Sequence, residues 1–368
     1  MTTYIIRRFI QGFLVLILST FVIYSILIVT PGGPADQIAA LKADRIHPVN
    51  AALLTALLQA YKLDSPYPVN YLRWLFDPMD TRQVDPNNDN KVTRKGIDLT
   101  LGPLHIEGAG VLTGDFGNSL QVAKGQNVMK LMGDRMGNTL ALTVSALLLS
   151  LLIAFPIGML SAIRQYSKLD YAVTAFSFVG LSMPAFWLGL MLVIFLAVIP
   201  KQLHDAGLSW MPYLPTGFAY DTDQHDNALN RVYHLILPVV VLSFVSVAQF
   251  SRFIRGSMLE VLRQDYVRTA WAKGLAQRTV IVRHALRNAL IPVITVVALT
   301  LPALLGGAIS TETVFSYPGM GSLFVQAIFK LDIPLVMGFL LIITTLIILS
   351  NILADVLYAV ADPRIHYS

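Results

Sequence analysis

Long apolar runs recur along this chain, and they constrain its fold more than any other feature of the sequence. An α-helix needs about 20 mostly apolar residues to cross the hydrocarbon core of a bilayer. Six runs approach or exceed this length, and the fourth is the shortest and could extend at either end: Phe9–Thr30, Thr139–Ile163, Ala172–Ile199, Leu235–Phe250, Ala289–Ser310 and Pro334–Val360. The pattern predicts an all-α polytopic membrane protein with six transmembrane helices.

Composition agrees with this prediction and narrows the chemistry. Apolar residues make up 55% of the chain and charged residues 13%, whereas charged residues make up about 25% of a soluble globular chain. The absence of cysteine excludes disulfides, thiolate chemistry and cysteine-ligated metals. The first run ends in Thr-Pro-Gly-Gly-Pro instead of a small-x-small cleavage site, so we expect it to be a membrane anchor and not a cleaved signal peptide.

The distribution of lysine and arginine predicts the orientation. With the N-terminus in the cytoplasm, the short outer loops hold only Lys201, Arg231 and Lys330. The inner segments then hold Arg7, Arg8, Arg164, Lys168, Arg252, Arg255, Arg263, Arg268, Lys273, Arg278, Arg283, Arg287 and Arg364. Cytoplasmic loops carry such an excess of cations. We therefore expect both termini to be cytoplasmic and the long loop after the first helix to be extracytoplasmic.

The predicted spans and orientation divide the chain into four segments. Residues 1–30 form the cytoplasmic end and first transmembrane helix, residues 31–137 the extracytoplasmic region, and residues 138–360 a core of five further helices with a cytoplasmic loop at 252–288. Residues 361–368 form a cytoplasmic tail. Within the outer region, residues 77–110 are polar, turn-rich and poor in core residues, which indicates an insertion.

A short amphipathic helix is predicted in the basic cytoplasmic loop. Apolar residues recur there with the spacing of one helical face, at Val267, Ala270, Trp271, Gly274 and Leu275. Polar residues lie away from this stripe, at Asp265, Arg268, Thr269 and Lys273. We expect Asp265 to cap the start of the helix and Gly274 to end it. The stripe needs an apolar surface, which is either a groove on a soluble partner or the lipid headgroup region.

No enzyme signature is found in the sequence. There is no phosphate-binding loop, no zinc-protease motif and no nucleophile elbow, and we predict no catalytic residue and no metal site. Glu312 and Asp355 lie near the ends of their spans, where we expect them to be hydrated or paired. If this protein moves a solute uphill, the energy must come from another chain.

Polar side chains within the spans are the candidates for lining a path. In the fourth and fifth spans we select Ser243, Ser246, Gln249, Thr295 and Thr300. Helix packing through hydroxyl groups is an alternative explanation for them. Prolines also occur within the spans, and each can kink its helix: Pro156, Pro184, Pro238, Pro292 and Pro302.

Several motifs together resemble the permease subunits of bacterial ABC importers of the peptide/nickel type, specifically the dipeptide/oligopeptide permease B-like subunit. The motifs are GDFGNSL at Gly114–Leu120, GLSMPAFWLGL at Gly180–Leu190, the loop sequence at Asp265–Thr295 and ETVFSYPGMGSLFVQAI at Glu312–Ile328. The Asp265–Thr295 segment is similar to the peptide-permease form of that family's cytoplasmic signature loop. It departs from the general signature, Glu-Ala-Ala, in having Arg268, Thr269 and Ala270, and Trp271 stands where this branch often has arginine. The 77–110 insertion is longer than the resemblance leads us to expect.

The resemblance implies a type I ABC importer (MetI-like) permease fold and a bacterial inner-membrane location. It implies a second homologous permease subunit, two ATPase subunits that bind ATP and Mg, and an extracytoplasmic binding protein that delivers di- or oligopeptides. The 265–275 helix would be the coupling helix that contacts an ATPase. Alternative cargoes in the same transporter class are nickel chelates, sugars or peptide antibiotics; a non-transport subunit of a membrane complex is a third interpretation.

Overall fold

The computed structural model describes residues 2–31, 36, 58, 63, 66–76, 97–101, 104–108, 115–221 and 227–361. The chain forms two compact units, each assembled from segments that are distant in the sequence. The first unit comprises Met1–Ile5, Gly137–Ser322 and Leu346–Ser368, and the second comprises Ile6–Met136 and Leu323–Thr345.

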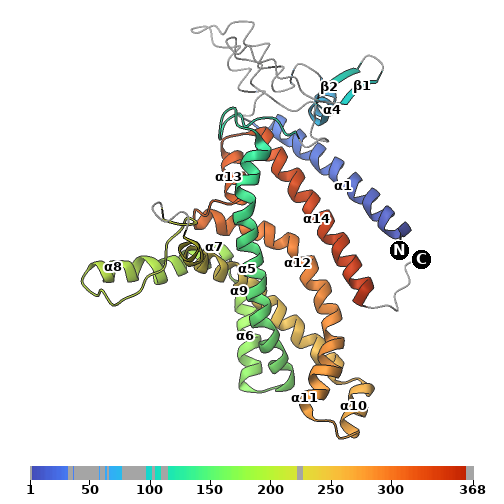
Figure 1. Cartoon of the computed structure of the whole chain (residues 1–368), viewed down its shortest axis with the longest axis vertical. Helices are drawn as coiled ribbons and strands as arrows, with labels where there is room; N and C mark the ends of the chain where they lie inside the picture. The colour runs from blue at the N-terminus through green and yellow to red at the C-terminus, as the bar shows by residue number, and fades with distance from the viewer. Residues whose placement is uncertain are drawn as a thin grey trace. The chain divides into compact units, whose positions relative to one another are not determined.

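Helix α9 (Ala228–Leu262) is the central element of the first unit, where it packs against α6, α7 and α12. The elements of this unit that the structure describes are the later part of α5 (Val128–Ile163), α6 (Lys168–Ser182), α7 (Ala185–Val193), the π-helix η3 (Ile194–Val198), α8 (Ile199–Asp205), α9, α10 (Asp265–Ala272), α11 (Gln277–Thr279), the π-helix η4 (Val280–Leu286) and α12 (Arg287–Val314), together with helical residues 2–5, 320–322 and 346–361 (Figure 1).

Two apolar clusters fill the interior of this unit. One joins α5, α9 and α12 near the loop after α12, around Leu142, Leu237 and Phe315. The other joins the same three helices with η4 nearer to α10, around Phe250, Ile254 and Met258. Burial of these side chains provides the main favourable contribution to packing within the helix group. It also fixes how η4 and α12 lie against the end of α9.

The second unit contains most of α1 (Thr2–Val29), α4 (Val69–Phe76), the start of α5, most of α13 (Met320–Phe329) and the first part of α14 (Ile333–Ala361). Aromatic rings hold α4 against α1: Tyr71 stacks edge-on to Phe21 with centroids 5.2 Å apart, and its hydroxyl lies 2.9 Å from the Thr20 hydroxyl. The unit also contains an antiparallel hairpin of β1 (Ile97–Leu101) and β2 (Leu104–Gly108), with Leu99 opposite Ile106.

The hairpin lies inside the segment predicted to be an insertion. It adds a short β element to a fold that is otherwise helical over the described residues, and the all-α class is confirmed for the membrane core. Residues 77–96 of the insertion lie outside the described part of the chain. The assignment of that segment as an insertion therefore remains a prediction.

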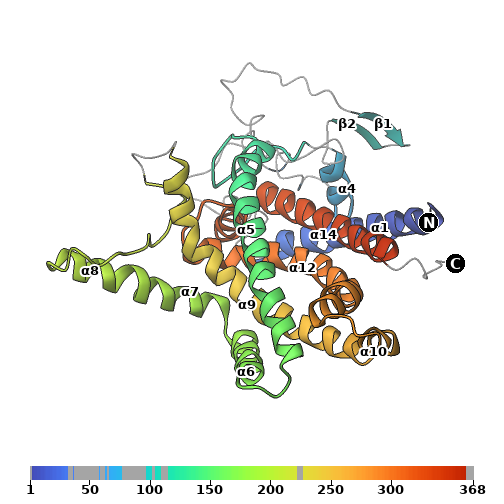
Figure 2. The ribbon, with the colours of Figure 1, turned by 60° about the horizontal axis from the view of Figure 1, so that its bottom comes forward.

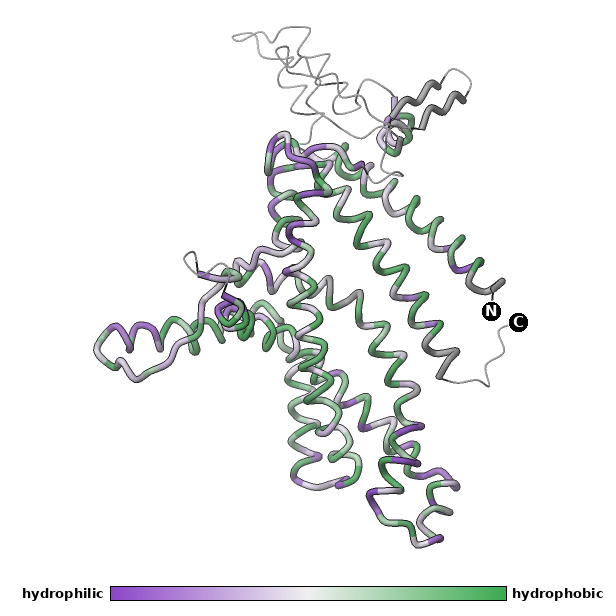
Figure 3. Tube along the Cα trace, viewed as in Figure 1, coloured by the Kyte–Doolittle hydropathy of each residue, from purple (hydrophilic) through white to green (hydrophobic). Residues whose placement is uncertain are grey.

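Among the described residues, five helices are long and apolar enough to cross a membrane: Ile6–Val29, Val128–Ile163, Ala185–Asp205, Ala228–Leu262 and Ile333–Val356. A sixth span is completed if the bent pair Gln277–Leu290 and Pro292–Leu301 counts as one. Helices α1, α7 and α14 are apolar along most of their length (Figure 3). The fourth run lies within a longer helix that extends beyond it at both ends, as the expectation that it could extend at either end allows.

The prediction of one continuous third span was wrong. The run from Ala172 to Ile199 contains two helices, α6 and α7, which diverge at Met183 and Pro184 (Figure 2). Met183 has an extended backbone, with φ −88° and ψ 122°, because the residue before a proline is disfavoured in the helical region. Apolarity continues through the break, so run length alone could not reveal it.

Of the five prolines selected within the spans, two lie at a break or bend and three do not, one of the three being Pro302 within α12. The chain breaks at Pro184, and the helices on either side of Ile291 meet at a bend of 46° just before Pro292. Proline lacks the N–H that would continue the helical hydrogen bonds and so favours bends at these points. By contrast, α5 and α9 continue through Pro156 and Pro238.

Candidate functional site

Helix α10 is the predicted amphipathic helix, and its ends follow from local sequence. The N-cap is Gln264, whose side chain makes no capping bond, so the expectation that Asp265 caps the helix was wrong. Asp265 is instead the first helical residue, where a carboxylate favours the positive end of the helix dipole. At the other end Gly274 has φ +73°, a left-handed conformation that glycine adopts without steric cost. The prediction that Gly274 ends the helix is confirmed.

The apolar stripe of α10 is divided between two environments. Val267 is 0% exposed and Ala270 is 5% exposed, and both pack against Val280, with Val261 and Leu262 beside them. The prediction that the whole stripe faces a partner was therefore wrong for these two residues. They attach α10 to the end of α9 and the start of η4, within the same chain.

Exposed residues of α10 and of the turn after it form what we call the free face: Tyr266, Arg268 and Trp271 on the helix, and Lys273, Gly274 and Leu275 after it. Trp271 is 43% exposed, and the large apolar side chains of Tyr266 and Leu275 are also exposed. Arg268 lies 3.7 Å from Asp265 in a solvated pair, which contributes little to stability. The free face combines apolar rings with cations, which is the composition of a protein-binding surface.

A buried ion pair holds α6 to α9 before α10 begins. Arg255 donates from Nε and Nη2 to the two carboxylate oxygens of Asp170, at 2.5 and 2.8 Å. Asp170 also accepts from the Ser161 hydroxyl and from the amide N–H of Tyr166. Asp170 precedes the apolar run, and the Arg255 hydrogen bond lowers its pKa below the ordinary value. The Asp170 carboxylate is therefore ionised, and it accepts hydrogen bonds from Arg255, Ser161 and Tyr166.

Sequence analysis did not identify Asp170, although one signal was present. Ser167 accepts a hydrogen bond from the Asp170 amide at 3.3 Å, which is the N-cap contact of a Ser-x-x-Asp sequence. That pattern marks the start of α6 but does not reveal Arg255. The partner is 85 positions further along the chain, and only the packing of α6 on α9 brings the two together.

The candidate path residues lie in different surroundings. Ser243 and Ser246 are buried within this chain, and the Ser243 hydroxyl donates to the Val240 carbonyl. Thr300 donates to Val297 in the same way at 2.7 Å, and Thr295 is half-buried. Gln249 is exposed and lines a cavity of about 670 Å³ between α6, α9 and α12. Of the five, Gln249 is therefore the residue on which a path assignment can rest.

Glu312 organises the loop between α12 and α13. Its carboxylate is fully buried and accepts from the Thr139 hydroxyl at 2.6 Å and from the Ser322 amide at 2.9 Å. The expectation that it is hydrated was wrong, and the paired alternative is correct. Burial, followed by repulsion from Glu312, raises the pKa of Tyr317 to about 12, so Tyr317 stays neutral beside it.

Replacing Gly319 with alanine should destabilise this loop. A Cβ at Gly319 would lie 2.2 Å from Cδ of Glu312, and the overpacking should cost about 1–3 kcal/mol. Thermal unfolding of the purified protein in detergent measures the change. Gly133→Ala is the matched control, because a Cβ there meets no atom within 4 Å. Equal unfolding temperatures for the two variants would show that Glu312 is free to move.

Asp332 has a comparable role in the second unit. It is buried and accepts from the Ser119 hydroxyl at 2.5 Å and from the amides of Gln121 and Val122 at 3.0 and 2.9 Å. The backbone N–H groups of Leu120, at the end of the GDFGNSL motif, and of the two residues after it thus form a nest for a carboxylate at the start of α14. Sequence analysis noted the motif but not its acidic partner.

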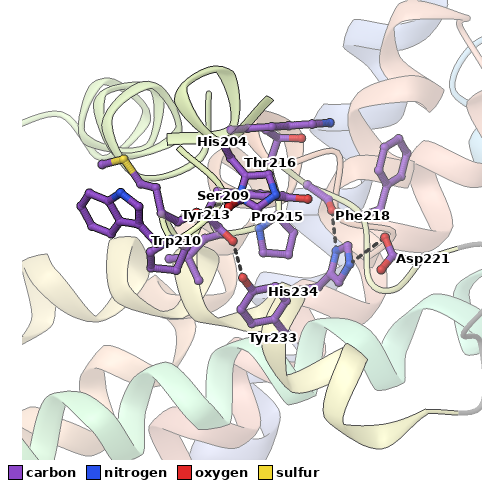
Figure 4. A pocket seen from close by; sticks show the side chains of 15 residues that line it. His204, Ser209, Trp210, Tyr213, Pro215, Thr216, Phe218, Asp221, Tyr233 and His234 are labelled. Atoms are coloured by element: carbon purple, nitrogen blue, oxygen red, sulfur yellow. Dashed lines mark hydrogen bonds and ion pairs between the residues drawn. The ribbon is translucent and has the colours of Figure 1, made fainter. Parts of the chain in front are cut away.

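A second cavity, of about 620 Å³, lies in the loop between α8 and α9 (Figure 4). Buried His234 has Nδ1 2.7 Å from the Gly217 carbonyl oxygen and Nε2 3.4 Å from an Asp221 oxygen. A carbonyl oxygen can only accept, so Nδ1 donates this hydrogen bond. The Asn230 amide also donates to Asp221 at 2.7 Å. These contacts attach the loop to the first turns of α9, and we assign them a structural role.

The described residues contain no group of three His, Cys, Asp or Glu side chains that could hold a metal. The polar groups identified above bind other groups of this chain. Among the described residues, we select the free face of α10 as the candidate surface for a partner and the cavity at Gln249 as the candidate site for a solute.

Comparison with known proteins adds three findings. Residues 154–367 match the family described as the binding-protein-dependent transport system inner membrane component. The chain is 36% identical over 367 residues to the oligopeptide transport system permease protein AppB of Bacillus subtilis (strain 168), with 100% of both chains covered. It is 41% identical over 268 residues to the dipeptide transport system permease protein DppB of Escherichia coli (strain K12), covering 70% of this chain and 78% of that protein.

A solved structure shows the same fold. A chain of the MetNI methionine ABC transporter, determined in inward-facing conformations, matches with a TM-score of 0.51 and 17% identity. The match covers 64% of this chain and 97% of that chain. The prediction of a MetI-like permease fold is confirmed.

Proposed function

The chain belongs to the family of binding-protein-dependent transport system inner membrane components, and we propose that it is the permease subunit of an ABC importer for short peptides. It is a multi-pass inner-membrane protein. Relatives that align over most of its length are named for oligopeptide and dipeptide transport, which supports peptides as the cargo. The positive-inside distribution supports cytoplasmic termini.

The observation that carries this proposal is the free face of α10 on an anchored helix. Two buried residues, Val267 and Ala270, fix α10 to the chain, while Trp271 and Leu275 remain exposed beside two cations. A short helix that presents apolar rings in this way fits a groove on a soluble protein. We propose that this protein is an ATPase subunit, with ATP and Mg bound to the ATPase and not to this chain.

The transport cycle follows from how α10 is attached. Movement of a bound ATPase displaces α10, and the Val267–Val280 contact transmits the displacement to α9 and η4. The ion pair between Asp170 and Arg255 makes α6 move with α9. Alternating access then results from rigid helices that move about bends, such as those at Pro184 and Pro292. A second permease subunit completes the path, and an extracytoplasmic binding protein delivers the peptide.

Reconstitution tests the proposal. The chain is co-expressed with the permease, ATPase and binding-protein genes that adjoin it, and the purified complex is placed in proteoliposomes. We expect ATP-dependent accumulation of a labelled tripeptide that requires the binding protein. Uptake of nickel chelates, sugars or peptide antibiotics without tripeptide uptake would retain the transporter class and reject the peptide cargo. A complex without ATPase subunits would reject the transporter class.

A further inference from the structure

The cavity at Gln249 carries opposite charges along one side of α9. Its lining includes Gln249, Arg252, Gly256, Ser257, Glu260 and, from α12, Pro292. The α9 residues that line this cavity end a few positions before α10 begins. Its polar groups come mainly from α9, whose position is fixed by Arg255 to Asp170 and by Ser257, which donates to the Ala289 carbonyl of α12 at 2.8 Å.

The two charges are uncompensated within the described part of the chain. Arg252 lies over the ring of Phe178, with its guanidinium carbon 5.1 Å from the ring centroid. Neither Arg252 nor Glu260 is among the described ion pairs, which join other residues. Both side chains are exposed to the cavity side of the helix. A cation held over an aromatic ring and a separate carboxylate are both available to a ligand.

The spacing of these charges suits a short zwitterion. Residues 252, 256 and 260 recur every four positions, so they lie along one face of α9. At 1.5 Å per residue, the Cα atoms of Arg252 and Glu260 are about 12 Å apart. An extended peptide spans at most ~3.3–3.6 Å per residue, which places its two termini about 12 Å apart when it has three or four residues.

Gly256 leaves the space between the charges open. A Cβ at this position would meet no atom within 4 Å. Glycine in a helix interior is destabilising by roughly 0.5–1 kcal/mol relative to alanine, and nothing in this chain packs closely against Gly256 to require it. The position is therefore available for the middle of a ligand that bridges Arg252 and Glu260.

We infer that the Arg252–Gly256–Glu260 face of α9 binds the two termini of a tri- or tetrapeptide during translocation. Arg252 binds the free carboxylate and Glu260 binds the free ammonium group. This inference rests on the proposed function and adds a substrate class to it: short peptides with both ends unmodified. The partner permease subunit would close the other side of the cavity.

A charge-matching experiment tests the assignment. Proteoliposomes containing the complete transporter are supplied with saturating binding protein and one of three tripeptides: unmodified, C-terminally amidated or N-terminally acetylated. For the wild type, we expect each modification to reduce uptake about tenfold, the factor for losing one partly solvated charge-assisted hydrogen bond. The Arg252→Gln transporter should take up the amidated peptide as well as it takes up the unmodified one. The Glu260→Gln transporter should take up the acetylated peptide as well as it takes up the unmodified one.

The crossed comparison distinguishes recognition from a structural role. Arg252→Gln should keep its discrimination against the acetylated peptide, and Glu260→Gln its discrimination against the amidated one. The inference would be overturned if the two substitutions lower uptake of all three peptides equally. It would also be overturned if both variants still discriminate against the amidated and the acetylated peptide. If the wild type transports no tripeptide at all, the failure lies with the proposed function instead.

A steric variant provides a second measurement. Gly256→Leu should fold, because the space at Cβ is open, and should reduce tripeptide uptake at least about tenfold by occupying the cavity. Gly133→Leu is the matched control, since Gly133 is also helical, exposed and without a neighbour within 4 Å of a Cβ. Wild-type uptake by assembled Gly256→Leu transporter would show that no ligand passes along this face.

Discussion

Trp271→Ala should reduce the amount of ATPase that co-purifies with the permease by about tenfold or more. Trp271 is the largest apolar side chain on the free face of α10 and is 43% exposed. Truncating a central tryptophan at a protein interface commonly costs about 2 kcal/mol or more, and each 1.4 kcal/mol is a tenfold change in affinity. Membrane insertion should be normal, since Trp271 is absent from the cluster that anchors the helix.

Trp187→Ala is the matched control for this experiment. Trp187 lies on α7 and is 45% exposed, so its truncation removes a similar side chain from a different surface. We expect that variant to retain its ATPase. If both variants retain ATPase at the wild-type level, α10 is not the coupling helix, and cross-linking of Trp271 to phospholipid would favour the headgroup alternative.

The burial of Ala270 decides which substitutions are informative. An acidic residue at Ala270 would be placed among Val267, Val280 and the end of α9, where an unpaired charge is costly. Loss of ATPase from such a variant could then reflect displacement of α10 instead of a lost contact. Trp271 tests the contact, whereas Ala270 tests the anchor.

Asp170→Asn should cost about 3 kcal/mol of unfolding free energy, the second large effect that we predict. The substitution leaves Arg255 charged and poorly paired, and breaking a buried pair on one side typically costs ~3–5 kcal/mol. It also weakens the bond to the amide of Tyr166, whose backbone has φ 62°, an uncommon conformation for a residue other than glycine. Denaturation of the purified protein in detergent measures the change.

Two further variants give this prediction its controls. Asp265→Asn removes a carboxylate that is 97% exposed and 3.7 Å from Arg268, and exposed pairs contribute at most about 1 kcal/mol. The double variant Asp170→Leu with Arg255→Leu should recover stability, because replacing both members of a buried pair by apolar residues is often neutral. If Asp170→Asn is as mild as Asp265→Asn, the pair does not hold α6 to α9.

The segment at 265–275 shows how far a periodic pattern can be interpreted. The spacing of Val267, Ala270 and Trp271 predicted a helix with one apolar face, and Gly274 predicted its end; both are observed. The same spacing could not predict which part of the face is used internally. A stripe packs equally well on its own chain or on a partner, and only the position of Val280 decided it.

The third run shows a different limit. Hydropathy identifies segments that prefer lipid, because each apolar side chain contributes to transfer wherever it lies. Hydropathy contains no information on the direction of a helix axis. The apolar run therefore did not show that the chain turns at Pro184 between α6 and α7. The rule that the residue before a proline disfavours helix indicated the correct position at Pro184. The same rule would also predict breaks before the prolines within α5 and α9, but those helices continue.

The amino-acid sequence by itself determined the lipid-spanning class, the permease family, the short amphipathic helix α10 and its glycine end, since these depend on residue type and on spacing within one element. Tertiary structure alone decided that Asp170 meets Arg255, that Glu312 meets Thr139 across 173 positions, and that Arg252 and Glu260 flank one cavity with Pro292. Contacts of this kind depend on how helices pack, which is set by the shapes of many side chains together and is not encoded in any local period.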